Sequence, residues 1–129
     1  MGQTTYHEAK AGISKACPAS PNCVSSKITP KDDHYIKPIA FSQSNQDAWS
    51  SLKKIINGLP RTKVQLDSAD VLHVTFTSLI FRFVYDVYFE LNNEFIHVKS
   101  QSRLGSWDLG VNRRRVNKIR KLLDDEDES

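Results

Sequence analysis

The sequence predicts an α+β fold: a single antiparallel β-sheet in the order β-α-β-β-β-β-α, with two helices packed on one face. Three observations lead to this prediction. Residues 44–59 carry apolar side chains at helical spacing between a serine cap and a closing Gly-Leu-Pro. Residues 62–103 change to a period of two, interrupted by turn residues, which is typical of antiparallel strands. Residues 111–123 return to helical spacing, so two amphipathic helices can cover the sheet.

The elements follow one another in order along the chain. Residues 35–41 predict a first strand, and Pro38 places it at a sheet edge because proline has no N–H for the ladder. Ser44 caps the first helix. Turn signals then separate four strands, at 62–66, 71–78, 82–91 and 94–102. A loop around Gly105 leads to the last helix, 111–123.

The composition is that of one globular domain. The chain has 129 residues, of which 39% are hydrophobic and 26% charged, enough for a buried core. The longest apolar run, residues 79–84, is interrupted by Arg82 and is far shorter than a bilayer span, so we expect no transmembrane segment. The first ten residues lack the basic and apolar regions of a signal peptide.

We divide the chain into three parts. Residues 1–33 contain three prolines and no sustained apolar period, so we expect an extended lead that carries a Cys17/Cys23 loop. Residues 34–123 hold the α+β domain. Residues 124–129 form an acidic tail, so residues 1–123 are more basic than the net charge of +3 for the whole chain suggests.

Turn lengths set the expected register of the two central hairpins. A two-residue loop at Asn92-Asn93 pairs Asp86 with Lys99. A four-residue loop at residues 78–81 sets His73 beside Asp86. A slip of one residue would turn the apolar side chains to the other face. The expected core face carries Leu72, Val74, Phe76, Phe81, Phe83, Tyr85, Val87, Phe89, Ile96 and Val98.

The opposite, open face of the sheet is the candidate ligand-binding site. It is expected to carry His73, Asp86 and Lys99 in a row across three strands, with Arg82 and Arg103 at its margin. The three cations outnumber the acidic residues on this face, which favours an anionic ligand or partner. A structural explanation stands beside the functional one, because exposed sheet faces commonly carry ion pairs worth roughly 0–1 kcal/mol each.

The stretch CPASPNCVSS, residues 17–26, holds both cysteines, and several explanations compete. A redox pair is disfavoured because five intervening residues lose the geometry of a CxxC motif. A metal site would need two further ligands, for which His7 and His34 are available, but the spacing fits no zinc pattern. A disulfide between Cys17 and Cys23 needs nothing further and suits an oxidising compartment. Free thiols are the other alternative.

The last helix contains RRRVNKIRK, residues 113–121, with six basic side chains in nine positions. Such a block suits phosphate, an anionic membrane surface or the acidic tail. Nucleic-acid binding is disfavoured, because recognition usually interleaves aromatic or polar readers and this helix offers Asn112 and Asn117. Solvation of an outer helix face is the structural alternative.

Three motifs in order resemble the bacterial and plastid family called domain of unknown function 1499. They are CPASPNCVSS, FRFVYDVYF (81–89) and IHVKSQSRLGSWDLGVNRRRVNKIR (96–120). The resemblance covers nearly the whole chain, from about Cys17 to Leu123. The chain departs from the family pattern at Tyr85, Tyr88, Lys99 and Ser106-Trp107.

The resemblance implies no reaction, since the family has no established activity. Many relatives look exported, anchored as lipoproteins or directed to plastids, which implies a disulfide and an extracytoplasmic location. The residues that match the family's motifs are Asp86, Ser100, Arg103, Asp108, Asn112 and Arg113 to Arg115.

Together these observations predict a non-catalytic binding module of the cell envelope, in the periplasm or another extracytoplasmic compartment. Its partner would be an anionic small molecule or an envelope protein, and we expect no cofactor and no metal. One alternative is a small hydrolytic or redox enzyme using His73 and Asp86 or the cysteines. The hydroxyl expected beside His73 is that of Thr75, and an isolated threonine is a poor nucleophile. A second alternative is a self-associating module, such as a homodimer.

Overall fold

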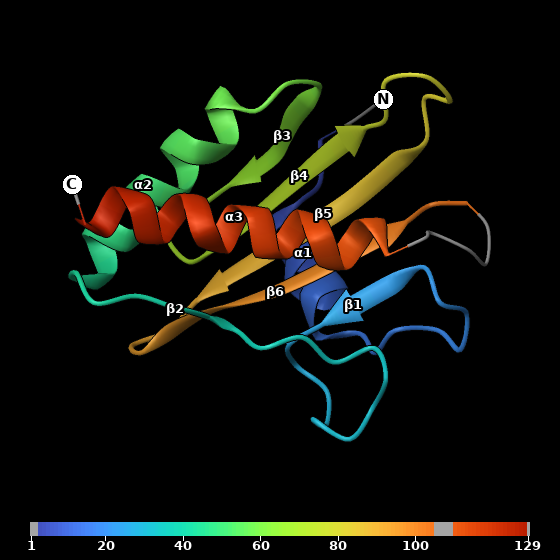
Figure 1. The fold of residues 1–129 in the computed structure, drawn as a ribbon, viewed down its shortest axis with the longest axis horizontal. Helices are drawn as coiled ribbons and strands as arrows, with labels where there is room; N and C mark the ends of the chain where they lie inside the picture. The colour runs from blue at the N-terminus through green and yellow to red at the C-terminus, as the bar shows by residue number, and fades with distance from the viewer. Residues whose placement is uncertain (1–2, 105–109, 129) are drawn as a thin grey trace.

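The computed structural model describes residues 3–104 and 110–128, which form three helices and one antiparallel sheet of six strands (Figure 1). The strands lie in the order β1-β6-β5-β4-β3, and β2 also pairs with β6. The helices are α1 (Tyr6–Ser14), α2 (Asn45–Gly58) and α3 (Val111–Glu128). The strands are β1 (Cys23–Ser25), β2 (Ile39–Ala40), β3 (Thr62–Asp67), β4 (Val71–Thr77), β5 (Val84–Leu91) and β6 (Phe95–Ser102). The predicted α+β class and antiparallel sheet are confirmed.

Helices α2 and α3 cover one face of the sheet, as their apolar spacing predicts (Figure 1). Ser44 caps α2 by accepting a hydrogen bond from the Asp47 N–H at 3.1 Å. Helix α3 begins as predicted but runs to Glu128, so the acidic residues continue the helix instead of forming a separate tail. The strands β4, β5 and β6 contribute eight predicted residues to the core: Leu72, Val74, Phe76, Tyr85, Val87, Phe89, Ile96 and Val98. Val24 of β1 and Ile39 of β2 join them and were not predicted.

The β5–β6 hairpin is displaced by two residues from its predicted register. Lys99 pairs with Tyr88 instead of Asp86, because the turn occupies residues 92–95. The Asn92 side chain closes this longer turn by accepting hydrogen bonds from two later N–H groups, both at 2.9 Å. An even displacement leaves every side chain on its predicted face, so the core is unchanged.

The β4–β5 turn is also longer than predicted, and three assignments there were wrong. It occupies residues 78–83, closed by the Ser78 N–H donating to the Phe83 carbonyl at 2.9 Å. The register of this hairpin is therefore also displaced by two residues, and His73 pairs with Tyr88 instead of Asp86. Phe81 and Phe83, predicted to lie in the core, are 74% and 40% exposed. Arg82, predicted to lie in a strand, has a φ of 59° within the turn.

The prediction that residues 1–33 are extended was wrong for Tyr6–Ser14, which forms α1. Thr5 and Glu8 form a capping box, in which each side chain accepts a hydrogen bond from the other residue's N–H, at 3.1 and 2.9 Å. Helix α1 contacts β4, β5 and β6 from the face opposite α2 and α3 (Figure 1). The polar face that was expected to be open is therefore covered by a helix.

The cysteine segment leads from α1 into the sheet edge. Cys17 and Cys23 form a disulfide, with Cα atoms 5.7 Å apart, which lies within the usual range. The chain then enters β1, which pairs with β6. Of the predicted strand at residues 35–41, β2 keeps Ile39–Ala40 and pairs with the same strand, so the edge position that Pro38 indicates is confirmed.

Candidate functional site

Three of the five predicted ligand-binding residues, His73, Asp86 and Arg103, lie together on the face that α1 covers. Asp86 Oδ1 accepts a hydrogen bond from His73 Nε2 at 2.8 Å. Arg103 donates to both carboxylate oxygens, from Nε at 2.9 Å and from Nη2 at 3.0 Å. Such bidentate, charge-assisted bonds fix both partners in orientation. The Arg103 side chain remains 53% exposed and Asp86 is 20% exposed.

These contacts keep Asp86 ionised. Burial raises the pKa of the carboxyl, but the hydrogen bonds from His73 and Arg103 outweigh burial and bring the pKa down to about 2. The hydrogen bond to Asp86 in turn raises the pKa of Arg103. Because Arg103 is already bound to a carboxylate, an anionic ligand here would have to compete with Asp86.

His73 is 4% exposed and is held by three neighbours. Its ring stacks on Tyr88 with the centroids 4.3 Å apart, and its Nδ1 makes a hydrogen bond with the Thr4 hydroxyl. In the neutral ring Nε2 donates to Asp86, so Nδ1 accepts from Thr4. Thr4, and not the predicted Thr75, is therefore the hydroxyl bound to this imidazole. An open depression of about 480 Å³ above the cluster is lined by Gln3, Thr4, Glu8, His73, Asp86, Tyr88 and Arg103.

Lys99 and Arg82 are not part of this cluster. Lys99 is 3% exposed, and its Nζ donates to the Gly12 carbonyl of α1 at 3.0 Å. Burial lowers the pKa of this ammonium group. Arg82 lies exposed in the β4–β5 turn. The covered face therefore does not present the three cations that favoured an anionic ligand there.

A second ion cluster fastens α1 to the sheet. Glu90, 7% exposed, accepts hydrogen bonds from Lys10 of α1 and from Lys27, the latter at 2.5 Å. Burial raises the pKa of Glu90, but the two lysines lower it more, and the net pKa falls. Tyr6 adds a hydrogen bond from its hydroxyl to Asp70 at 3.0 Å. Together these contacts explain how a short helix stays on a polar sheet face.

On the other face of the sheet, two arginines of α3 donate hydrogen bonds to the backbone of the segment between β1 and β2. Arg113 donates to two carbonyl oxygens, at 2.9 and 3.0 Å, and Arg120 to two more, at 2.8 and 2.9 Å, all within residues 33–38. The family resemblance singled out Arg113, and its contacts are structural. These two arginines do more than solvate an outer helix face.

Arg115 belongs to a buried polar network between α3 and β6. Its guanidinium lies over two aromatic rings of the core, 4.9 and 4.1 Å from their centroids. Ser100 donates to Asn112 Oδ1 at 2.6 Å, and Asn112 Nδ2 donates to the Asn22 carbonyl at 3.1 Å. Asn112 therefore ties α3 to the segment before β1. Asp108, also singled out by the resemblance, lies outside the described residues.

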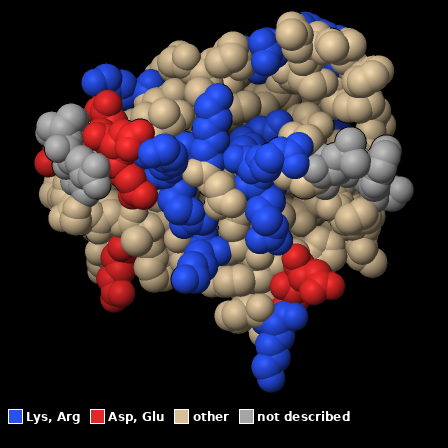
Figure 2. All heavy atoms as spheres, in the orientation of Figure 1, with Lys and Arg blue, Asp and Glu red and all other residues tan. Residues whose placement is uncertain are grey.

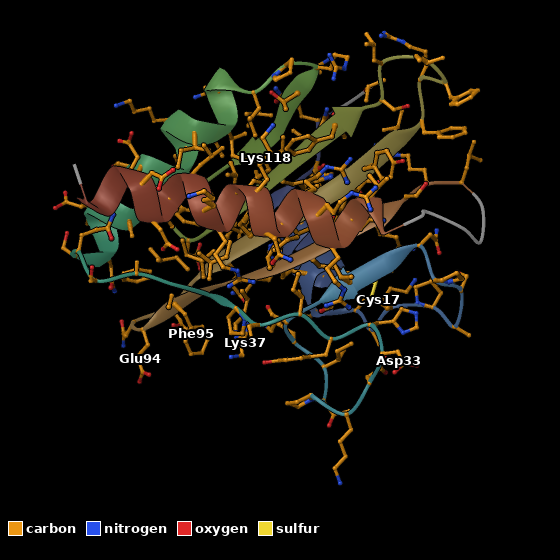
Figure 3. The ribbon with its side chains drawn as sticks, in the orientation of Figure 1. Cys17, Asp33, Lys37, Glu94, Phe95 and Lys118 are labelled. Atoms are coloured by element: carbon orange, nitrogen blue, oxygen red, sulfur yellow. A yellow bond between two sulfur atoms is a disulfide. The ribbon has the colours of Figure 1, made fainter. Side chains whose placement is uncertain are left out.

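A groove of about 260 Å³ opens between α3 and the end of β4. We call it the basic groove, because four cations line it: Arg61, Arg114, Arg115 and Lys118. Its apolar lining consists of Leu59, Pro60, Phe76, Val111 and Ile119, and none of the described lining residues is acidic. Figure 2 shows Lys and Arg side chains gathered across this face, and Figure 3 shows Lys118 on the side of α3 towards β4.

Sequence reasoning missed both α1 and the basic groove. A helix signal was present for α1, since residues 5–8 read Thr-x-x-Glu, and Ala9 and Ile13 follow one turn apart. No local pattern joins Arg61 to Lys118, which lie far apart in the sequence and meet through the packing of α3 on the sheet.

In residues 3–104 and 110–128, no group of three or more His, Cys, Asp or Glu side chains could hold a metal ion. No helix in this part of the chain is long and apolar enough to cross a membrane.

Comparison with known proteins identifies the family and nothing finer. The chain belongs to the family described as protein of unknown function (DUF1499), whose model matches residues 15–123. No curated protein and no solved structure matches it. The matched region begins after α1, so Thr4 lies outside it, whereas every residue that lines the basic groove lies inside it.

Proposed function

We propose that this member of the DUF1499 family is a non-catalytic binding module of the cell envelope that takes an amphipathic anion in the basic groove. One observation carries the proposal: four cations surround an apolar surface, and none of the described residues that line the groove is acidic. On the opposite side of the sheet, Arg103 and Lys10 are bound to Asp86 and Glu90, so an anionic ligand there would have to compete with a carboxylate.

The lining favours a ligand with both an apolar and a charged part. Leu59 and Val111, which are partly exposed, would contact a ring or chain. Arg61, Arg114 and Lys118 would face a phosphate, sulfonate or carboxylate. A volume of about 260 Å³ lies just below the usual range for whole small-molecule pockets. The groove therefore suits one anionic group of a ligand, either a small molecule or a segment of an envelope protein.

Location and assembly belong to the same proposal. The Cys17–Cys23 disulfide supports an oxidising, extracytoplasmic compartment, because the cytosol keeps thiols reduced. A homodimer also stays a prediction, for which light scattering is the direct measurement.

A matched pair of fluorescent probes tests the groove. 8-Anilinonaphthalene-1-sulfonate carries an apolar ring system and one negative charge, and N-phenyl-1-naphthylamine is its uncharged counterpart. We expect Lys118→Glu to weaken binding of the sulfonate by about fivefold or more, since it reverses one charge beside the site. Binding of the uncharged probe should change little.

The control variant is Lys31→Glu, which reverses an exposed charge outside the groove. If both variants weaken the sulfonate equally, the effect comes from net charge alone and the groove is not the binding site. Raising the salt concentration should weaken sulfonate binding to the wild type, because the groove cations are exposed to screening.

A second candidate function, hydrolysis of an acyl ester, is favoured by the chain of contacts Thr4–His73–Asp86. Thr4 Oγ1 would attack the carbonyl carbon while its proton passes to His73 Nδ1, and Asp86 would stabilise the imidazolium. The ester C–O bond would then break, and the alcohol would leave with the proton held by His73 Nδ1. Water would attack the acyl-threonine with His73 as its base and release a carboxylic acid and the Thr4 hydroxyl. The test is release of 4-nitrophenolate from 4-nitrophenyl acetate, and a rate that is the same in Thr4→Val removes this candidate.

A further inference from the structure

The turn between β4 and β5 exposes an unusual number of large apolar side chains. Four of the six exposed large apolar side chains among the described residues lie in it. We call these four the apolar tip: Leu79, Ile80, Phe81 and Phe83, exposed by 66%, 79%, 74% and 40%. Hairpin turns normally carry Gly, Asn, Asp or Pro, so the needs of the hairpin do not explain this composition.

The apolar tip has a defined shape. Ser78 accepts from the Phe83 N–H at 2.8 Å, which closes the turn. The rings of Phe81 and Phe83 stack with their centroids 5.5 Å apart. Between them Arg82 adopts a left-handed backbone conformation, with φ 59°, which is uncommon for a residue other than glycine. The turn projects beyond the helices at one end of the sheet (Figure 1).

The charges in the turn and at its base are positive. Arg82 lies within it, and Arg61 lies at its base, where Nε donates to the Thr77 carbonyl at 3.0 Å. Residues 71–85 contain no acidic residue. The next acidic residue, Asp86, is already bound by an arginine and a histidine. An anionic surface could therefore approach the apolar tip without meeting an unpaired carboxylate of the β4–β5 hairpin.

This combination fits a bilayer that contains anionic lipid, in which apolar side chains enter the headgroup boundary and arginines meet the phosphates. A protein partner usually covers about 800 Å² on each side, which is more than a single turn presents. A second copy joined tip to tip would bring the two Arg82 side chains together.

We propose that the β4–β5 turn inserts the apolar tip into the surface of an anionic bilayer, with Arg61 and Arg82 at the level of the headgroups. The inference rests in part on the proposed function, because Arg61 also lines the basic groove. A headgroup phosphate reaching that groove from the bound bilayer would be the anionic group of its ligand.

Sedimentation with vesicles tests the inference on the whole chain. We expect the wild type to bind vesicles that contain both phosphatidylcholine and phosphatidylglycerol. It should not bind vesicles made only of phosphatidylcholine. The double variant Ile80→Ser/Phe81→Ser should weaken binding by about tenfold or more, and Arg82→Glu by about fivefold or more. All three positions are exposed, so the unfolding temperature should stay close to that of the wild type. Lys31→Glu is the matched charge control.

Tryptophan fluorescence supplies a second readout. Phe81→Trp should show a blue shift, beyond the wild-type signal, when phosphatidylglycerol vesicles are added, because the indole leaves water. An unshifted emission at saturating vesicles overturns insertion of the tip. Equal binding of the wild type and the double variant overturns the inference as well. A third outcome would also overturn it: the double variant binds vesicles as the wild type does but has a different oligomeric mass by light scattering. A second copy of the chain would then be the partner of the apolar tip.

Lys118→Glu separates this inference from the proposed function. Vesicle binding that survives Lys118→Glu but is lost in the tip variant supports insertion even if the sulfonate titration fails at the groove. Binding that is lost in Lys118→Glu and kept in the tip variant overturns insertion and leaves the groove as the anion site.

Discussion

At Asp86, one carboxylate joins two strands and the end of a third. It accepts from His73 of β4 and from Arg103 just after β6. The proximity of His73 and Asp86 could be predicted, since the hairpin register was wrong by an even number and both side chains kept their face. The position of Lys99 could not be predicted, because its hydrogen-bond acceptor is a carbonyl of α1, a helix that the sequence reasoning did not expect.

The low pKa of Asp86 makes a pH-dependent prediction for Asp86→Asn. The folded pKa of about 2 lies below the unfolded value of about 3.9. The carboxylate therefore stabilises the folded state above about pH 4, and this contribution is lost as the pH falls towards 2. We expect Asp86→Asn to lower the free energy of unfolding by about 2 kcal/mol at neutral pH.

Urea denaturation across the pH range measures this effect. The difference in unfolding free energy between the wild type and Asp86→Asn should shrink as the pH falls from 4 to 2. Glu94→Gln, at an exposed turn position, is the control. A difference for Asp86→Asn that stays constant with pH would show that the carboxylate does not titrate as described.

A second prediction at the same scale concerns Lys99→Glu. Lys99 is buried against the Gly12 carbonyl, so the variant removes the donor to this carbonyl and buries a carboxylate beside it. We expect a loss of about 3–5 kcal/mol in the free energy of unfolding, measured by urea denaturation. Lys99→Met, which keeps the length of the side chain, should lose clearly less. Equal, small losses in both variants would mean that the site is open to water.

At the scale of elements, α1 decides what the polar face can do. It packs closely enough that a Cβ on Gly12 would lie 2.6 Å from the Tyr88 ring, and that ring is itself stacked on His73. A face so covered has little room for a ligand outside the depression beside Arg103. The sequence contained the capping box for this helix, but nothing in it indicated which side of the sheet the helix covers.

Glycine substitutions test this packing. Helix propensity alone would make Gly12→Ala stabilising by about 1 kcal/mol. The contact with Tyr88 should reverse the sign and lower the free energy of unfolding by about 1 kcal/mol or more. Gly58→Ala in α2 meets nothing within 4 Å and should stabilise by about 0.4–1 kcal/mol. Urea denaturation gives both values, and a stabilising Gly12→Ala would contradict the close docking of α1.

The disulfide makes an element-scale prediction of its own. It closes a short loop immediately before β1, and its loss should cost about 2–3 kcal/mol by freeing the unfolded chain. The double variant Cys17→Ser/Cys23→Ser measures the stability effect. Intact mass after blocking free thiols should show the native protein unlabelled and two hydrogens lighter than its reduced form. Two labelled thiols without reduction would contradict the bond.

At the scale of the whole molecule, cations lie on both sides of the sheet. Towards α1, Lys10, Lys27 and Arg103 each bind a carboxylate. Towards α3, cations line a groove in which the described residues supply no carboxylate. The sequence showed the excess of basic residues on α3, but it could not show which of them hold the backbone and which face the groove, since that depends on contacts with residues 33–38 and 59–61.

The most direct test of the account is to locate where the molecule binds an amphipathic anion. We would titrate the ¹⁵N-labelled chain with phenyl phosphate and follow the amide signals by NMR, using benzyl alcohol as the uncharged control. The account predicts that phenyl phosphate shifts the signals of Leu59, Arg61, Phe76 and Lys118, and that benzyl alcohol does so weakly. Shifts centred on His73, Asp86 and Arg103 instead would contradict it and return the binding site to the face that α1 covers.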